Sequence, residues 1–598
     1  MDLKFNNRGF SLIHFTVFLF LILLFFLLIA DESFLKERDI KIKMPDGVCL
    51  ATDLLRPSAG GQYPVVLIRT PYNKENMAEA IGEYLATNGF AVIVQDVRGK
   101  FASEGEFLPF VNERKDGLAT LNWIARQKWC NGRIGMWGTS YLGYCSLVLG
   151  VSRHPSLKTL IQISGLGDLR PIIYPGGAFH LMSGLPQAIF MLGKEPTSLK
   201  KLDFKRLFGF LPLDKALASV DIDDTVWKML SDKKVILQHK SEFFLADQYK
   251  NLDIPIFHIS GWNDMVYRST LEVYEAAKKS APDNRQNPRF QKLLIGPWHH
   301  DQQWSNQTKV GNEDFGPQSV MGLDKIKELS LRWFDHFLKD ADNGITAESS
   351  VRFFVMGRNE WQEADSWPLP GIEHQKWFLR SRKGAGSLHG DGRLSRQATA
   401  SRKISDTYVF DPLNPVPTRG GVNIHFFPQN LGITDQRSIE EREDVLVYSS
   451  DPLIQDLEIV GPLRVVLYAS SEGIDTDFTA KLVEVRSDGY ARIIEDGIIR
   501  RQSYQLLNNN SALIAGKVYR WGIDLGATAI LIKKGNRIRL EISSSNFPKY
   551  DRNPNTGENP LTVTDFKKVR QTVFHSPQQP SHLVLPVRIS WSDERKLP

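Results

Sequence analysis

The sequence predicts an α/β protein with a mostly parallel sheet, an inserted helical cap and a C-terminal β-sandwich. Between residues 34 and 165, buried apolar strands alternate with helical segments, as in sheets built from right-handed crossovers. From 166 to 250 the alternation stops, and segments rich in Phe, Pro and Gly take its place. Beyond residue 345 the apolar period becomes two, with turns between short strands, which is typical of a β-sandwich.

Composition is that of a multidomain globular protein. At 598 residues and 42% hydrophobic, the chain is long enough for two or three sizeable cores. The net charge of +6 is spread along the chain, which argues against a nucleic-acid partner. Three cysteines, Cys49, Cys130 and Cys145, show no metal-ligand spacing and allow one disulfide at most.

Residues 1–33 have the pattern of a signal anchor or signal peptide. Lys4 and Arg8 precede an apolar run from Phe10 to Ala30. A run of about 20 residues can cross a bilayer, whereas a signal-peptide core spans about 7–15. The basic flank predicts that the rest of the chain is extracytoplasmic. We expect a membrane-anchored protein that needs detergent for release; the alternative is a secreted or periplasmic protein after cleavage.

The first part of the sheet can be followed strand by strand. The alternating stretch from Leu35 to Pro57 predicts two antiparallel strands around a turn. Continuous apolar runs then predict buried parallel strands, which are Tyr63–Arg69, Phe90–Gln95 and Leu157–Ser164. Helices are expected at 77–88 and 115–128.

Ser140 lies where an apolar strand turns sharply into a helix. Gly138 and Gly143 leave room for a strained backbone and a close helix, as in the nucleophile elbow that exposes a serine Oγ above a sheet. The common elbow has glycine two positions after the serine, whereas this chain has Leu142 there. A tight turn without chemistry is therefore the alternative.

Two later strands end in acid–base residues. The strand Ile254–Ser260 precedes Asp264, and the strand Lys292–Gly296 precedes His300. The chain order serine, aspartate, histidine, with each residue just past a strand, is that of the catalytic triad of α/β hydrolases. The pattern predicts a serine hydrolase built on Ser140, Asp264 and His300, with no metal or organic cofactor.

Other histidines fit this pattern less well. His258 lies within an apolar strand and is expected in the core, while His180 and His239 fall in the cap. His299 remains an alternative base beside His300. A metal site at His299-His300-Asp301 is disfavoured because a second group of ligands is missing.

The cap follows a strand end on the side where α/β sheets bind ligands, so we expect it to cover the pocket. Its phenylalanines are expected mainly in the cap core; they are Phe179, Phe190, Phe204, Phe208, Phe210, Phe243 and Phe244. The helix Asp324–Lys339 is expected to close the catalytic domain. The predicted sandwich strands are Val351–Val355, Leu463–Tyr468, Phe478–Val485, Arg537–Ile542 and Leu583–Ile589.

Together the motifs resemble those of the cocaine-esterase and X-Pro dipeptidyl-peptidase group of α/β hydrolases (CocE/NonD type), which includes α-amino-acid ester hydrolases and glutaryl acylases. The resemblance spans nearly everything after the N-terminal segment. It rests on Arg69-Thr-Pro-Tyr72, Asp96-Val-Arg-Gly99 with Ser103-Glu-Gly105, Gly138-Thr-Ser140-Tyr141-Leu-Gly143, Gly261-Trp-Asn-Asp264 and Gly296-Pro-Trp-His-His300. In this group tyrosine follows the serine and glycine comes third, as in this chain.

The resemblance implies a role for each matching residue. Ser140 would be the nucleophile, Asp264 the orienting acid and His300 the base, while the Tyr72 hydroxyl and the Tyr141 backbone N–H would form the oxyanion hole. It also implies a small-molecule ester or amide substrate, cleaved through an acyl-enzyme.

The implied domains are an α/β-hydrolase domain at 34–165 and 251–345, a helical cap at 166–250, and a jelly-roll, galactose-binding-like domain at 346–598. An X-Pro dipeptidyl-peptidase is the alternative within the class. A non-catalytic protein that binds a surface ligand is the alternative outside it.

One departure bears on the substrate. In the α-amino-ester branch, acids two and three places after the triad aspartate help to bind the substrate ammonium, whereas this chain has Val266 and Tyr267. We therefore expect uncharged, apolar or aromatic acyl groups, because an unpaired ammonium in a dry pocket is costly.

Overall fold

The computed structural model describes residues 34–280, 291–398, 404–424, 426–427, 430–500 and 512–588. The segment predicted to be a signal anchor or signal peptide, 1–33, lies outside these residues. Within the ranges just given, no helix combines the length and the apolar character needed to cross a membrane.

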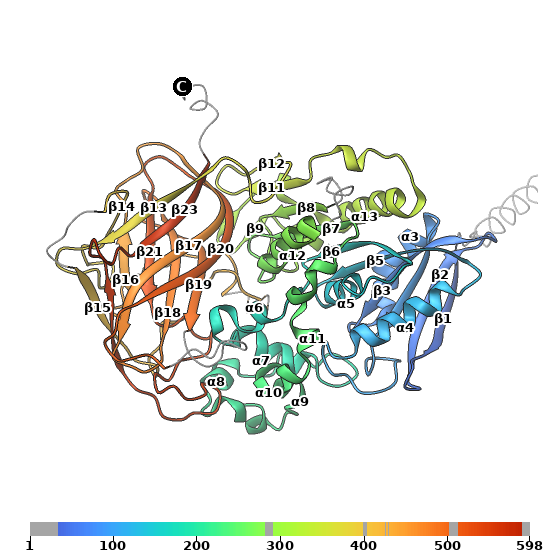
Figure 1. Ribbon diagram of the computed structural model, residues 1–598, viewed down its shortest axis with the longest axis horizontal. Helices are drawn as coiled ribbons and strands as arrows, with labels where there is room; N and C mark the ends of the chain where they lie inside the picture. Colours follow the sequence, from blue (N-terminus) through green and yellow to red (C-terminus); the bar gives the residue numbers. More distant parts are fainter. Residues whose placement is uncertain are drawn as a thin grey trace, which may run out of the picture.

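A ten-stranded sheet forms the first half of the molecule, in the order β1-β2-β4-β3-β5-β6-β7-β8-β11-β12 (Figure 1). Its strands are β1 (Phe34–Lys43), β2 (Cys49–Pro57), β3 (Tyr63–Thr70), β4 (Ala91–Asp96), β5 (Cys130–Thr139), β6 (Leu157–Ile163), β7 (Ile256–Gly261), β8 (Gln291–Gly296), β11 (Val351–Val355) and β12 (Glu360–Ala364). β1 and β2 pair antiparallel, whereas β3 to β8 pair in parallel. The predicted antiparallel entry and parallel centre are thus confirmed.

Helices cover both faces of this sheet. They are α2 (Lys74–Met77), α3 (Glu83–Thr87), α4 (Glu113–Ala125), α5 (Tyr141–Gly150), α12 (Tyr267–Ser280) and α13 (Gly322–Lys339), with a π-helical turn at Ala78–Gly82. On one face α4 and α5 share a core with Leu67 and Met136, and on the other α3 and α13 pack with Ile68 and Trp137. Because both faces are buried, the central strands are apolar at nearly every position.

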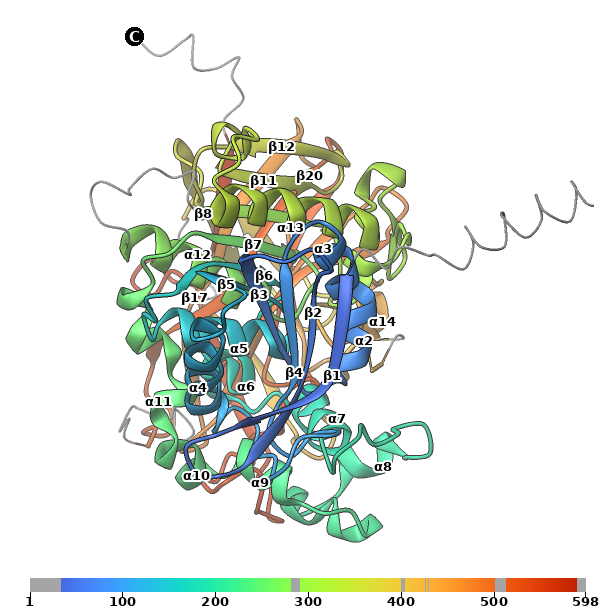
Figure 2. The ribbon, with the colours of Figure 1, turned by 90° about the vertical axis from the view of Figure 1, so that its right-hand side faces the viewer.

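The segment 166–250 forms a helical cap beneath the sheet, in the angle between the two β-rich halves (Figures 1 and 2). Its helices are α6 (Arg170–Ile173), α7 (Leu181–Phe190), α8 (Phe204–Gly209), α9 (Thr225–Ser231), α10 (Lys233–Gln238) and α11 (Lys240–Phe243). Phe179, Phe208, Phe243 and Phe244 are buried in its core, as predicted.

The prediction that Val351–Val355 belongs to the β-sandwich is wrong. β11 lies parallel to β8, with Val351 opposite Leu293, and β12 pairs antiparallel with β11 at the edge of the first sheet. The chain passes from β8 through α13 to β11, which is a β-α-β crossover that adds a parallel strand. A five-residue apolar strand carries no signal for which sheet it joins, so the period alone placed it in the sandwich.

The C-terminal half is built of mostly antiparallel strands with little helix. They are β13 (Ile372–Arg380), β14 (Arg393–Ser395), β15 (Ser405–Phe410), β16 (Leu446–Ser449), β17 (Leu457–Ser471), β18 (Asp477–Val485), β19 (Ala491–Arg500), β20 (Tyr519–Ile532), β21 (Arg537–Ser543), β22 (Val569–Phe574) and β23 (His582–Arg588). β14 and β16 pair in parallel. Leu463, Val465 and Leu467 alternate into the same core as Tyr267 of α12. This shared core joins the C-terminal domain to the hydrolase domain.

Candidate active site

The serine turn has the strained geometry that the sequence predicts. Ser140 follows β5 and precedes α5, with φ 52° and ψ −120°, a region that residues other than glycine rarely occupy. A Cβ at Gly138 would lie 2.2 Å from the Leu142 carbonyl oxygen, and one at Gly143 would lie 2.5 Å from the Gly165 Cα. Both positions therefore require glycine for the turn to close.

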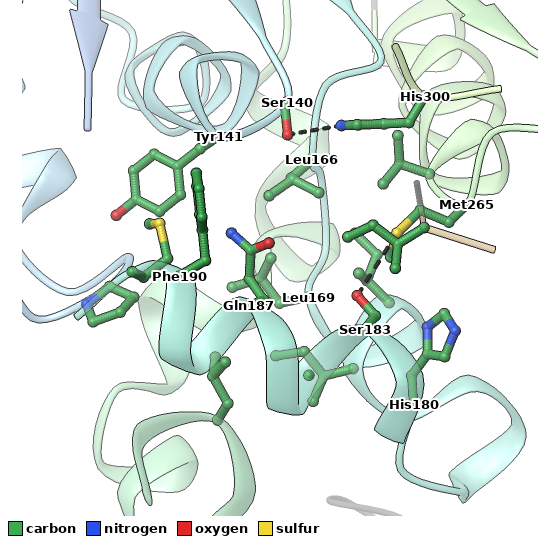
Figure 3. Close-up of a pocket in the computed structure, with 18 of the residues that line it drawn as sticks. Ser140, Tyr141, Leu166, Leu169, His180, Ser183, Gln187, Phe190, Met265 and His300 are labelled. Carbon is green, nitrogen blue, oxygen red and sulfur yellow. Dashed lines mark hydrogen bonds between the residues drawn. The ribbon is translucent and has the colours of Figure 1, made fainter. Parts of the chain in front are cut away.

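Ser140, His300 and Asp264 form a continuous hydrogen-bonded chain. His300 Nε2 lies 3.0 Å from Ser140 Oγ, and His300 Nδ1 lies 2.8 Å from Asp264 Oδ1 (Figure 3). Asp264 Oδ1 also accepts a hydrogen bond from the Val266 N–H at 3.1 Å, which fixes the carboxylate from a second side. The three residues come from the ends of β5, β8 and β7, so the parallel sheet brings them together.

The electrostatics of His300 are set by its neighbours. Burial lowers the pKa of this imidazole, but the charge and hydrogen bond of Asp264, with the charge of Asp301, outweigh burial and raise the pKa to about 9. Asp264 thus stabilises the imidazolium form, which is the form that a general base reaches when it takes a proton.

A cavity of about 310 Å³ opens in front of Ser140 Oγ. Figure 3 shows Gln187 and Phe190 of the cap facing Ser140 and His300. Three parts of the chain line it: strand-end loops, the cap, and Ile424 and Phe426 of the C-terminal half. Most of the lining is apolar, as in sites that take small organic molecules.

Comparison with known proteins places the chain in a family. Residues 46–302 match the X-Pro dipeptidyl-peptidase (S15) family, and residues 343–584 match the X-Pro dipeptidyl-peptidase C-terminal non-catalytic domain. The chain is 34% identical over 590 residues to cocaine esterase of Rhodococcus sp. (strain MB1 Bresler), covering 93% of this chain and 99% of that protein. The chain belongs to this S15 family of serine hydrolases. The resemblance seen in the sequence and the predicted enzyme class are confirmed.

Solved structures of similar fold cover most of this chain. An aminopeptidase from a marine sediment archaeon, Thaumarchaeota archaeon, superposes with a TM-score of 0.78 at 24% identity and covers 93% of this chain and 97% of its own. An α-amino acid ester hydrolase gives the same TM-score and identity over 94% and 97%. These likenesses confirm the predicted α/β-hydrolase fold with a β-rich C-terminal domain.

Tyr72 lies in the loop after β3, at the edge of the cavity. Its ring is 6.3 Å from that of Phe190, and its backbone N–H donates to Thr70 Oγ1 at 2.9 Å. Burial raises the pKa of the Tyr72 phenol, while hydrogen bonds to Ser140 and Gln187 act in the opposite direction. The Tyr72 hydroxyl therefore keeps its proton and can donate a hydrogen bond beside Ser140 Oγ.

Tyr141 is the first residue of α5, where backbone N–H groups have no partner within the helix. Its side chain points into a buried network that the sequence did not reveal. Tyr141 Oη accepts from the Phe110 N–H at 2.8 Å and donates to Glu113 Oε1 at 3.0 Å, and Glu113 is paired with Arg69 at 2.8 Å. The one feature of the sequence that could have indicated this network is the charged Arg69 at the end of the apolar strand Tyr63–Arg69.

The other histidines considered from the sequence occupy different places, and His239 lies half-buried in the cap just before α11, outside the cavity lining. His258 is fully buried and contacts Gln291 Oε1 at 3.2 Å, as expected for a core residue. His180 of the cap lines the cavity. His300 is the histidine in contact with Ser140 Oγ, which favours it over His299 as the base. In the described part of the chain, no group of three His, Cys, Asp or Glu side chains is arranged to hold a metal ion.

The residues two and three places after Asp264 lie in different surroundings in the structure. Val266 lines the cavity. Tyr267 is fully buried, and its hydroxyl instead donates to Glu495 Oε1 at 3.0 Å in the C-terminal domain. Of Val266 and Tyr267, the side chain that would face a substrate in the cavity is therefore that of Val266.

Proposed function

We propose that this hydrolase cleaves small carboxylic esters with an uncharged acyl group, using Ser140 as nucleophile. The supporting observation is the chain of two hydrogen bonds from Ser140 Oγ through His300 to Asp264, at the wall of a mainly apolar cavity. The esterase activity named for the Rhodococcus relative supports an ester rather than a peptide as substrate.

The reaction follows from the placement of these groups. His300 Nε2 takes the proton of Ser140 Oγ, and the oxygen attacks the ester carbonyl carbon. The oxyanion that forms accepts hydrogen bonds from the Tyr72 hydroxyl and the Tyr141 N–H. His300 then gives its proton to the departing alkoxide. Water attacks the acyl-enzyme by the same route in reverse, which releases the acid and restores Ser140.

The substrate preference is tested with two p-nitrophenyl esters, one of an α-amino acid and one of its des-amino analogue, which share the p-nitrophenolate leaving group. Among the described residues that line the cavity, Asp301 is the acidic one, and it is exposed and therefore hydrated. We expect kcat/KM for an α-amino acyl ester to be at least about tenfold below that of its des-amino analogue, since a charge loses water on entering an apolar cavity. Higher kcat/KM for the amino ester would contradict the uncharged acyl group.

An Xaa-Pro p-nitroanilide tests the second candidate, an X-Pro dipeptidyl-peptidase. The match of residues 46–302 to the family of that name favours including it. Such an enzyme must hold the substrate's N-terminal ammonium. Faster turnover of the Xaa-Pro compound than of the des-amino ester would replace the esterase proposal with this one.

Replacing Tyr72 with phenylalanine is expected to lower kcat about 10²–10³-fold at nearly unchanged KM, because the lost donor acts mainly in the transition state. The ring and its packing on Phe190 are kept, so the melting temperature should not change. Tyr84→Phe, on α3 and remote from the cavity, is the matched control. If kcat of Tyr72→Phe stays within a factor of about three of the wild-type value, Tyr72 has a packing role only. Loss of an oxyanion donor lowers kcat by far more than that.

Export is the remaining part of the proposal. The basic residues before the apolar run Phe10–Ala30 support an extracytoplasmic protein that is either anchored or released by cleavage. N-terminal sequencing of the mature protein separates the two forms, because cleavage would produce a new terminus near Asp31.

A further inference from the structure

A second cavity lies directly behind the wall of the active-site cavity. It has a volume of about 400 Å³ and lies between the cap, α12 and the C-terminal domain. Met265 and Ile172 line both cavities. These two half-buried side chains therefore form the partition between the space in front of Ser140 and the space behind it.

The backbone around Met265 is held in place, but its side chain is held weakly. Asp264 N–H donates to the Gly261 carbonyl at 2.9 Å, and Val266 N–H donates to Asp264 Oδ1 at 3.1 Å. The Met265 Sδ accepts a hydrogen bond from Ser183 Oγ at 3.7 Å (Figure 3), and thioether sulfur is a weak acceptor. The partition thus depends on an unbranched, adaptable side chain rather than on the backbone.

The second cavity has room for an alkyl chain that extends out of the active-site cavity past Met265 and Ile172. Its lining combines apolar side chains with charged ones; the apolar residues include Pro175, Ile498 and Ile499, and the charged residues are Arg268, Glu272 and Asp524. Pro171 and Gly176 in its lining are exposed, so this cavity reaches the surface. A chain that passed the partition would therefore meet free space instead of packed core.

The acyl group is the part of the substrate that the partition would limit. After the first half of the reaction the leaving group departs, whereas the acyl group stays bonded to Ser140 Oγ until water releases it. The part of the cavity beside Met265 is enclosed, because the neighbouring Val266 and Ser183 are buried, and it can hold an acyl group in that state.

We propose that Met265, together with Ile172, sets the maximum length of the acyl group by closing the active-site cavity off from the second cavity. The substrate class is then esters of short acyl groups that end at Met265. This proposal rests on the ester hydrolysis proposed above. It assigns a specificity-determining function to Met265, which directly follows the triad aspartate in the chain.

The test is an acyl-length profile of p-nitrophenyl esters from acetate to laurate, measured for wild type and for the variants Met265→Ala and Ile172→Ala. A pocket discriminates about 10–200-fold for each methylene group that it cannot admit. Removing either side chain should therefore raise the kcat/KM ratio of decanoate to butyrate at least about tenfold. The two variants open the same wall from different elements, so one still tests it if the other folds poorly.

Ile173→Ala is the matched control. Ile173 is the next residue of the same helix and lines the active-site cavity but not the second one. Replacing this isoleucine with alanine enlarges the active-site cavity without joining it to the second cavity. The decanoate-to-butyrate ratio of kcat/KM should therefore change by less than a factor of about three, which is well below the discrimination against one excluded methylene group.

Two results would overturn the assignment of Met265. One is an unchanged length profile in both wall variants with normal melting temperatures, and the other is an equal shift in Ile173→Ala. Either result leaves ester hydrolysis by the wild-type protein intact. Failure of wild type to turn over any ester of the series would instead overturn the proposed ester function, and the length limit with it.

Discussion

Ser140→Ala is expected to lower kcat for a p-nitrophenyl ester by about 10⁶-fold while leaving the fold unchanged. In the proposed mechanism this hydroxyl forms the covalent bond with the acyl group, and its oxygen lies 3.0 Å from His300 Nε2. Alanine is smaller than serine and also fits the strained turn, so the melting temperature should stay within a few degrees. The measurements are steady-state kinetics and stoichiometric labelling by a fluorophosphonate.

Ser146→Ala provides the control for labelling. Ser146 lies on the same helix, and its hydroxyl donates to the Gly143 carbonyl at 2.8 Å, away from the cavity. We expect one fluorophosphonate per chain in wild type and Ser146→Ala and none in Ser140→Ala. Labelling that persists after Ser140 is replaced would assign the nucleophile to another residue.

Local sequence patterns predicted much of the fold because burial repeats along each element. The strands Tyr63–Thr70 and Ala91–Asp96 are buried at nearly every residue, and their continuous apolar sequences predict this burial. The strand Val351–Val355 has an equally apolar sequence, but its membership in the first sheet depends on the crossover through α13. Pairing between distant strands is a property of the whole chain, so the sheet to which a strand belongs cannot be read from its period.

The same distinction explains which site residues could be predicted. Ser140, Asp264 and His300 each follow a strand, and the ends of parallel strands meet at one edge, so chain order sufficed to bring them together. Gln187 and Phe426 reach the cavity from the cap and the C-terminal domain. Neither lies in a local motif, because their position depends on how these parts dock on the sheet. The sequence therefore predicts the reacting groups better than the groups that select a substrate.

Asp264→Asn tests how the carboxylate acts on His300. The amide has the shape of the carboxylate but no charge, and its NH₂ can orient the imidazole with the wrong nitrogen protonated. A change of this kind lowers kcat by about 10⁴-fold in serine hydrolases with this triad. We expect a loss of that size with little change in KM or melting temperature, because Asp264 lies behind His300 and does not line the cavity.

The pH profile separates orientation from charge in this variant. His300 acts as a base when it is neutral, so kcat/KM for wild type should rise with pH through the pKa of His300, near 9. Burial lowers this pKa and Asp264 raises it, so removing the negative charge should move the rising limb to lower pH. Asp301→Asn removes the neighbouring charge without touching the hydrogen bond to Nδ1, and should shift the limb in the same direction by less, with a far smaller loss of kcat. A rising limb that stays in place in Asp264→Asn would mean that Asp264 does not control the protonation of His300.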